Sequence, residues 1–126
     1  MLFRSVDVGK VMNPRHLKSN IEGGTIMGVG EALYEEVTFD ASKVTSADWN
    51  TYRIPRMKDL PEIKVVFTSR DDHGIHGGGE AANSAAPPAI MAAFFDATGV
   101  MPRRTPLSPA YVKQLLNAGS APERPV

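Results

Sequence analysis

Glu80 directly follows three consecutive glycines, Gly77, Gly78 and Gly79, in a segment that we expect to join a strand to a helix. Glycine is kept where φ must be positive or where another group must approach the main chain closely. The carboxylate therefore has three interpretations. It complements the dipole of the following helix, it neighbours an anion site of backbone N–H groups, or it is a general base beside a bound cofactor. Spacing alone gives the first the most weight.

Other candidates for chemistry are weaker. Four potential metal ligands crowd one stretch before the glycines: Asp71, Asp72, His73 and His76. Without a second cluster at helical spacing, they are better interpreted as solvated loop residues. Glu31 closes "GVGE", which imitates the "GGGE" that ends at Glu80, but it falls in the middle of a predicted helix. We prefer Glu80 because a loop can present its side chain to a ligand. Neither the P-loop nor the Rossmann glycine pattern occurs.

Composition excludes several classes of protein. The 126 residues are 42% hydrophobic, which suffices for one domain with a core. Fourteen basic and fourteen acidic residues cancel, so the chain has no electrostatic footprint of a nucleic-acid or anionic-membrane binder. There is no cysteine for disulfides, thiolate zinc sites or iron–sulfur ligation. The longest nearly apolar stretch, residues 85–95, is too short to span a bilayer.

The pattern of elements predicts an α+β fold in one domain, residues 1–126, with a loose tail at 118–126. A helix should run from about residue 14 to 36, since Asn13 can cap it and proline suits its first position. The segments "EEVTFD" and "EIKVVFTS" read as strands of a small mixed sheet. Further helices should begin near residues 84–87, ending before Gly99, and after Ser108.

Two stretches together resemble a known family. They are "DVGKVMNPRHLKSNIEGGTIMGVGEALYEEVTFD" and "GGGEAANSAAPPAIMAAFFDATGVMPRRTPL". They are similar to the closing part of the large subunit of the molybdenum hydroxylases, the xanthine dehydrogenase and aldehyde oxidase family. The resemblance covers roughly residues 6–116. Four features recur in the family's order: Asp-x-Gly, Asn-Pro, a helix with amide-x-Glu-Gly-Gly, and a Gly-x-Gly-Glu loop before a helix that ends in Asp-Ala-Thr-Gly.

This resemblance implies roles for individual residues. Glu80 matches the glutamate beside the molybdenum, the base that acts when an oxygen is added to an electron-poor carbon. Gly77, Gly78 and Gly79 would let the backbone approach the molybdenum–molybdopterin cofactor, in its cytosine dinucleotide form, and the glycine-rich first helix would also face the pterin. Asn20 stands where the family usually has glutamine, one methylene longer. A proline pair follows Glu80 later than is usual in the family.

The resemblance also implies partners. They are the remainder of the large subunit, an iron–sulfur subunit and a flavin or cytochrome subunit, with an aldehyde or N-heterocycle as substrate. We expect this chain to be a C-terminal fragment or a split subunit, inactive and prone to self-association alone. The expected compartment is the cytoplasm, or the periplasm if the full-length subunit has an export signal. Two alternatives stay open: a stand-alone binding or interaction module without catalysis, and a small anion-binding protein.

Overall fold

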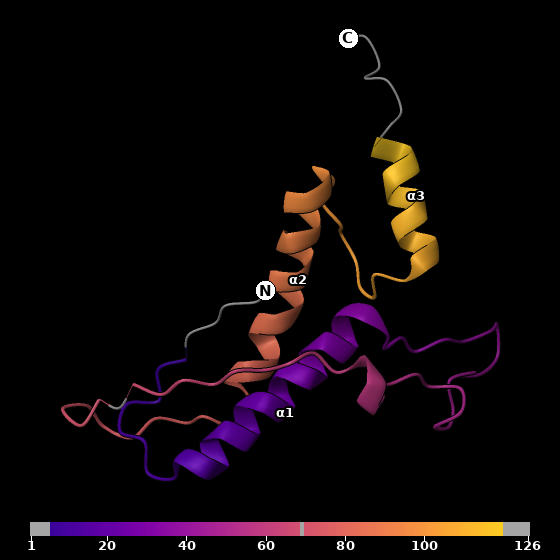
Figure 1. Cartoon of the computed structure of the whole chain (residues 1–126). Coiled ribbons are helices and arrows are strands. Elements are labelled where there is room, and N and C mark those ends of the chain that lie inside the picture. The colour runs from indigo at the N-terminus through magenta and orange to yellow at the C-terminus, as the bar shows by residue number, and fades with distance from the viewer. Residues whose placement is uncertain (1–5, 69, 120–126) are drawn as a thin grey trace.

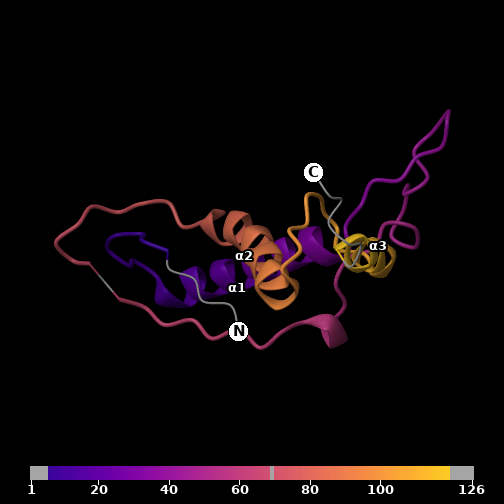
Figure 2. The same ribbon diagram turned by 90° about the horizontal axis from the view of Figure 1, so that it is seen from above.

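The computed structural model describes residues 6–68 and 70–119, and the helices of that part are four. They are α1 (Pro14–Leu33), the short 3₁₀ helix η1 (Met57–Asp59), α2 (Ala81–Thr98) and α3 (Pro109–Gly119). The predicted loose tail is wrong at residues 118 and 119, which belong to α3, and its other residues, 120–126, lie outside the described part. Figure 1 shows α2 rising from the middle of α1, with α3 near the C-terminal end of α1. The long connection between α1 and α2 is mostly extended and projects beyond both ends of α1 (Figure 2). None of the described helices is long and apolar enough to cross a membrane.

The predicted sheet is not found among residues 6–68 and 70–119. The α part of the α+β prediction is confirmed, but residues 35–40 and 62–68 of the two predicted strand segments are extended chain without a ladder, and residue 69 lies outside the described part. Only isolated bridges occur there, Gly9 with Ile75 and Phe39 with Val44. Val66 and Phe39 are 78% and 75% exposed. A strand is stable only when neighbours pair its backbone and cover its apolar face, and the described part of this chain supplies neither.

The predicted starts of α1 and α3 are confirmed. The side chain of Asn13 accepts a hydrogen bond from the N–H of His16 at 2.9 Å, and proline follows at the first helical position. Ser108 does the same before α3, accepting from the N–H of Tyr111 at 3.3 Å. α1 ends at Leu33 rather than near residue 36, because the chain leaves helical geometry at Tyr34. These local caps fix where the helices begin.

α2 begins earlier than predicted, at Ala81, so that Glu80 is its N-cap residue. Pro87 and Pro88 therefore lie inside the helix, whereas the sequence pattern predicts them in its first turn. The helix ends before Gly99, its C-cap residue, which has φ 71°. Proline in a helix interior leaves the carbonyl four residues earlier without its usual donor. For Pro87 that carbonyl belongs to Asn83. The predicted C-terminal glycine is confirmed, and the predicted start is wrong by about one turn.

Two glycines of α1 allow α2 to approach its backbone. A Cβ at Gly24 would lie 2.8 Å from the Cβ of Ala82, and a Cβ at Gly28 would lie 2.6 Å from the carbonyl oxygen of Asn83 and 2.7 Å from the Cβ of Ala86. Real Cβ atoms do not come this close, so the contact requires glycine. The expectation that the glycines of this helix face a pterin is therefore wrong for Gly28, which faces α2. Both glycines and both alanines are buried.

The N-terminal segment holds the loop that leads to the glycines. Gly9 has φ 64°, and its N–H donates to the Asp7 carboxylate at 2.8 Å. The Val8 carbonyl accepts from the N–H of His76 at 3.0 Å, and the N–H of Lys10 donates to the Gly74 carbonyl at 3.3 Å. A side chain at Gly9 would overlap the Gly74 carbonyl oxygen. The Asp-x-Gly sequence is thus a turn that pins residues 74–76 beside α1.

The chain exposes much more surface than a compact protein of its size. Its accessible surface is 9562 Å², whereas a folded monomer of 13.6 kDa exposes about 6,600 Å². Large apolar side chains stand in solvent, among them Met57 at 86% and Trp49 at 70% exposure. Within residues 6–68 and 70–119 the buried apolar residues are few: Val8, Val29, Ala32, Ala82, Ala86, Leu107 and Tyr111. The core is therefore narrow, and most of it lies where α2 and the segment before α3 meet α1.

Candidate active site

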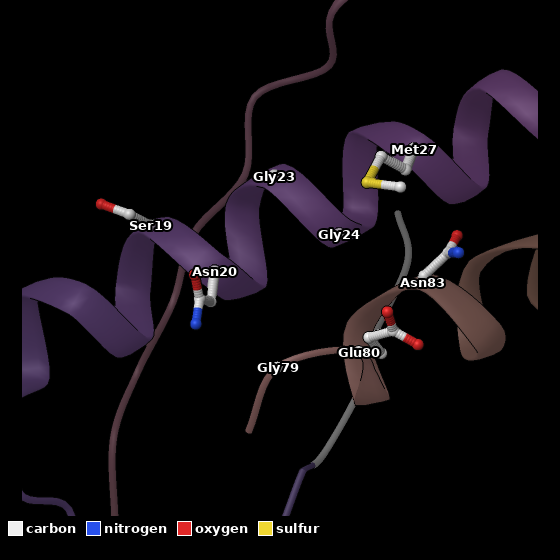
Figure 3. Close-up of a pocket in the computed structure, with 8 residues that line it drawn as sticks. All are labelled: Ser19, Asn20, Gly23, Gly24, Met27, Gly79, Glu80 and Asn83. Carbon is white, nitrogen blue, oxygen red and sulfur yellow. The ribbon is translucent and has the colours of Figure 1, made fainter. Parts of the chain in front are cut away.

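A pocket of about 250 Å³ lies between α1 and the start of α2. Its walls come from the middle of α1, the end of the glycine loop and the first turn of α2, as Figure 3 shows. The lining residues are Ser19, Asn20, Gly23, Gly24, Met27, Gly79, Glu80 and Asn83. Three residues that the sequence indicated thus meet at one cavity: Asn20, Gly79 and Glu80. Asn20 is far from the other two in the sequence.

Glu80 presents a carboxylate that the described chain does not engage. The residue has φ −120° and ψ −4°, and its side chain makes no capping hydrogen bond to α2. It is exposed, and its carboxylate has no hydrogen bond or ion pair with residues 6–68 or 70–119. A carboxylate used as a cap would bond to the free N–H groups of the first turn. Its position next to the helix N-terminus still suits a negative charge.

Asn20 faces the same pocket from α1. It is half-buried, and its amide has no hydrogen-bond partner in the part of the chain that the structure describes. The neighbouring Ser19 is different, because its hydroxyl donates to the carbonyl of Arg15 at 3.2 Å and so stays within the helix. Asn20 therefore brings an uncommitted donor and an uncommitted acceptor to the cavity.

The three glycines before Glu80 have three different surroundings. No atom lies within 4 Å of the place where a Cβ of Gly77 or Gly79 would stand, so the backbone there is bare. Gly79 lines the pocket, whereas Gly77 does not. Gly78 is packed: its Cβ would lie 2.7 Å from the side chain of Leu17. Gly78 also lines a second pocket of about 210 Å³, which shares Asn20 and Gly79 with the first.

Sequence reasoning missed the other walls of the pocket. Gly23 and Met27 follow Asn20 at helical spacing, three and seven positions on, so they share its face of α1. That spacing was the available signal. Asn83 lies one turn beyond Glu80 on α2, and it lines the pocket too. Its place could not be found from spacing alone, since the start of α2 was predicted too late.

Glu31 is linked to this site through Asn83. The Asn83 Nδ2 donates to the Glu31 Oε1 at 3.1 Å, while the Asn83 Oδ1 is buried and has no partner in the described chain. Glu31 lies within α1, as predicted. It holds the amide of a pocket residue, a contact that its position within a helix did not indicate.

The loop of acidic and histidine residues before the glycines, residues 71–76, contributes no residue to the pocket between α1 and α2. Asp72 pairs with Arg70 at 3.5 Å and with His73 at 3.5 Å, all on exposed chain. Across the described ranges, no three side chains of His, Cys, Asp or Glu are grouped to hold a metal ion. Among the described residues, the pocket presents the unpaired carboxylate of Glu80, the amides of Asn20 and Asn83, and glycine backbone without side chains around it.

Comparisons with known proteins show which family this chain resembles. Residues 3–61 match a family model described as a molybdopterin cofactor-binding domain. The chain is 34% identical over 120 residues to a subunit of the nicotinate dehydrogenase of Pseudomonas putida, and the match covers 94% of this chain and 10% of that protein. It is 33% identical over 109 residues to the xanthine dehydrogenase molybdenum-binding subunit of Escherichia coli O157:H7, with 82% of this chain and 14% of the relative covered.

A solved structure of a related protein has a similar fold. The fold matches the crystal structure of quinoline 2-oxidoreductase from Pseudomonas putida 86 with a TM-score of 0.77 and 28% identity, over 94% of this chain and 16% of the other. The sequence thus spans about a tenth to a sixth of the length of these proteins. By sequence and by fold, the chain belongs to the xanthine dehydrogenase and aldehyde oxidoreductase family of molybdenum hydroxylases, as a segment of the molybdenum-binding subunit.

Proposed function

We propose that this chain supplies the active-site base of a molybdopterin-dependent hydroxylase, with Glu80 as the base and Asn20 and Gly79 as contacts to the pterin. One observation carries the proposal. The free carboxylate of Glu80 and the free amide of Asn20 line one pocket, next to bare backbone at Gly79. A cofactor of this kind would carry the redox chemistry, and the protein would bind and orient it and supply a base.

The residues present fit such a group in three respects. Gly23 and Gly79 expose backbone with nothing within 4 Å of the place where a Cβ would stand, so a flat ring can approach closely. The buried Oδ1 of Asn83 lacks a donor in the described chain, which is a sign that a partner is missing. Among the described residues the pocket offers no cluster of metal ligands, so we assign this chain contacts to the pterin and no ligand to the molybdenum.

The chemistry divides between cofactor and protein. Bound molybdopterin would supply the redox step that adds oxygen to an electron-poor carbon of an aldehyde or N-heterocycle. Glu80 would accept the proton that this step releases, because its carboxylate oxygens form no hydrogen bond or ion pair within the described chain. Asn20 would orient the pterin through its amide. Gly77 and Gly78 would act indirectly, because Gly78 seats the loop on Leu17 and leaves Gly79 facing the pocket.

The remaining parts of the enzyme would cover the exposed surface of this chain. The accessible surface exceeds that of a compact monomer by an area typical of permanent interfaces. We propose that the remainder of the large subunit packs on it and that "EEVTFD" and "EIKVVFTS" become strands there by pairing with strands of that remainder. Iron–sulfur clusters would lie on a companion subunit, since this sequence has no cysteine to hold them. A flavin or haem would lie on a further subunit. The cytosine dinucleotide form is our proposal for the cofactor.

The experiment is a comparison of the chain alone with its complete assembly. The chain alone should contain no molybdenum and should self-associate through its exposed apolar side chains. The assembly should hold molybdenum and pterin and should add oxygen from isotopically labelled water to an aldehyde or N-heterocycle when an artificial electron acceptor is present. Stoichiometric molybdenum on the chain alone, or an assembly without pterin, would contradict the proposal.

A further inference from the structure

Asn83 is held in one orientation by a carboxylate on the facing helix. Figure 3 shows its side chain extending from α2 toward α1, beside Glu80 at the pocket. The Asn83 Nδ2 donates to the Glu31 Oε1 at 3.1 Å. A carboxylate has only acceptors to offer, so it can hold the nitrogen of the amide and not its oxygen. The Oδ1 is therefore fixed on the side away from Glu31.

That oxygen is an acceptor that the described chain leaves without a donor. It is buried and unpartnered, and such atoms in folded proteins usually mark a missing ligand or water. The helix against which Asn83 packs cannot help. Glu31 has only acceptors, and Gly24 and Gly28, which also lie against Asn83, bring no side chain, while their N–H groups lie inside α1.

We propose that Asn83 is a cofactor-binding residue whose Oδ1 accepts a hydrogen bond from an N–H of the pterin, with Glu31 as the positioning residue that sets the amide. This inference rests on the proposed function. A pterin ring carries N–H donors at its edge, and Asn83, one of the residues that line the pocket, has an acceptor without a donor in the described chain. The proposal requires the Asn83 side chain to rotate when the pterin binds, so that Oδ1, which is buried in this structure, turns to the cavity while Nδ2 keeps its bond to Glu31. The pterin is then held by amides from both helices, Asn20 on α1 and Asn83 on α2.

The test uses three variants of the complete assembly. Asn83→Leu keeps the volume and removes both amide groups. Asn83→Asp keeps an acceptor but sets two carboxylates against each other. Asn83→Asp combined with Glu31→Gln reverses the bond, since the new amide on α1 can donate to one oxygen of the new carboxylate on α2 while the other oxygen still accepts, and the net charge is unchanged. Pterin content per protein after extensive dialysis is measured by fluorescence of the released pterin, and the unfolding midpoint is measured beside it.

We expect pterin retention to fall about tenfold in Asn83→Leu and in Asn83→Asp, the size of one lost hydrogen bond, with an unchanged midpoint in Asn83→Leu. The double variant should recover most of the loss. Full retention in Asn83→Leu overturns the inference and leaves the proposed function intact, even if the KM for substrate rises. A loss that merely follows a lowered midpoint also overturns it. An unmodified assembly without pterin overturns the proposed function and this inference together.

Discussion

Gly28 of α1 lies directly against the backbone carbonyl of Asn83 on α2, closer than any residue with a Cβ could. Pro87 leaves this carbonyl without its helical donor, and the carbonyl is turned to Gly28, where α1 has no side chain in the way. The contact sets how near the first turn of α2 comes to α1. It therefore sets the width of the pocket that Asn20 and Glu80 share.

Replacement of Gly28 by alanine should destabilise the chain. The added Cβ would meet the Asn83 carbonyl oxygen at 2.6 Å and the Ala86 Cβ at 2.7 Å, and neither can move without shifting α2. Overpacking of this kind costs about 1–3 kcal/mol, more than the roughly 1 kcal/mol that alanine gains over glycine in a helix. Urea denaturation followed by circular dichroism measures the free energy of unfolding.

The matched control is Gly23→Ala, five residues earlier on the same helix. No atom lies within 4 Å of its Cβ position, so only the helix propensity changes, and stability should rise by about 0.5–1 kcal/mol. Opposite signs for the two variants are the expected result. Equal effects of Gly23→Ala and Gly28→Ala would show that close packing of α1 on α2 does not hold the fold.

Asp7 should make stability depend on pH in acid. The hydrogen bond from the Gly9 N–H holds the pKa of the Asp7 carboxyl below its ordinary value of 3.8. A folded-state pKa below the unfolded one gives stability that is present above 3.8 and is lost as the pH falls through the folded value. The stability difference between the unmodified chain and Asp7→Asn should thus be constant near neutral pH and shrink below that value. A difference that stays constant down to about pH 2 would contradict the assignment, because ordinary aspartates are protonated there.

Asn20→Gln in the complete assembly should retain the cofactor as well as the unmodified protein, or better. The added methylene extends the uncommitted amide further into the pocket. Asn20→Ala should lose about tenfold in pterin retention, because one hydrogen bond is removed. Ser19→Ala is the control, since the Ser19 hydroxyl is bonded to the carbonyl of Arg15 within α1. Pterin content measures all three, and a clear loss in Asn20→Gln would show that Asn20 does not contact the pterin.

Local chemistry explains which parts of the fold could be predicted from the sequence. Asn13 with Pro14 and Ser108 with Pro109 are signals contained within one turn, and they place the starts of α1 and α3 correctly. Gly99 ends α2 for the same kind of reason, a φ of 71° that favours glycine. The sheet failed because a strand depends on neighbours, and "EIKVVFTS" has none in the described chain.

The candidate site was predictable only in part, for a similar reason. Glu80 and Asn20 were found by their types and by the family resemblance, and the structure brings them to one pocket. The roles of the glycines depend on what lies opposite them, which no spacing reveals: Gly24 and Gly28 face α2, while Gly79 faces the cavity. The bond between Glu31 and Asn83 joins two helices and is likewise a product of tertiary packing.

The central claim is that Glu80 is the base, and the direct measurement is the turnover of Glu80→Gln in the complete assembly with its molybdenum content determined in the same sample. The amide keeps the shape of the side chain but cannot take the proton. Turnover should therefore fall by about 10²–10⁴-fold at normal molybdenum content. Glu62→Gln, which removes an exposed carboxylate from the extended connection, should leave turnover unchanged and is a better control than Glu31, which holds Asn83. Equal turnover of Glu80→Gln and the unmodified assembly, at equal molybdenum content, would contradict the account.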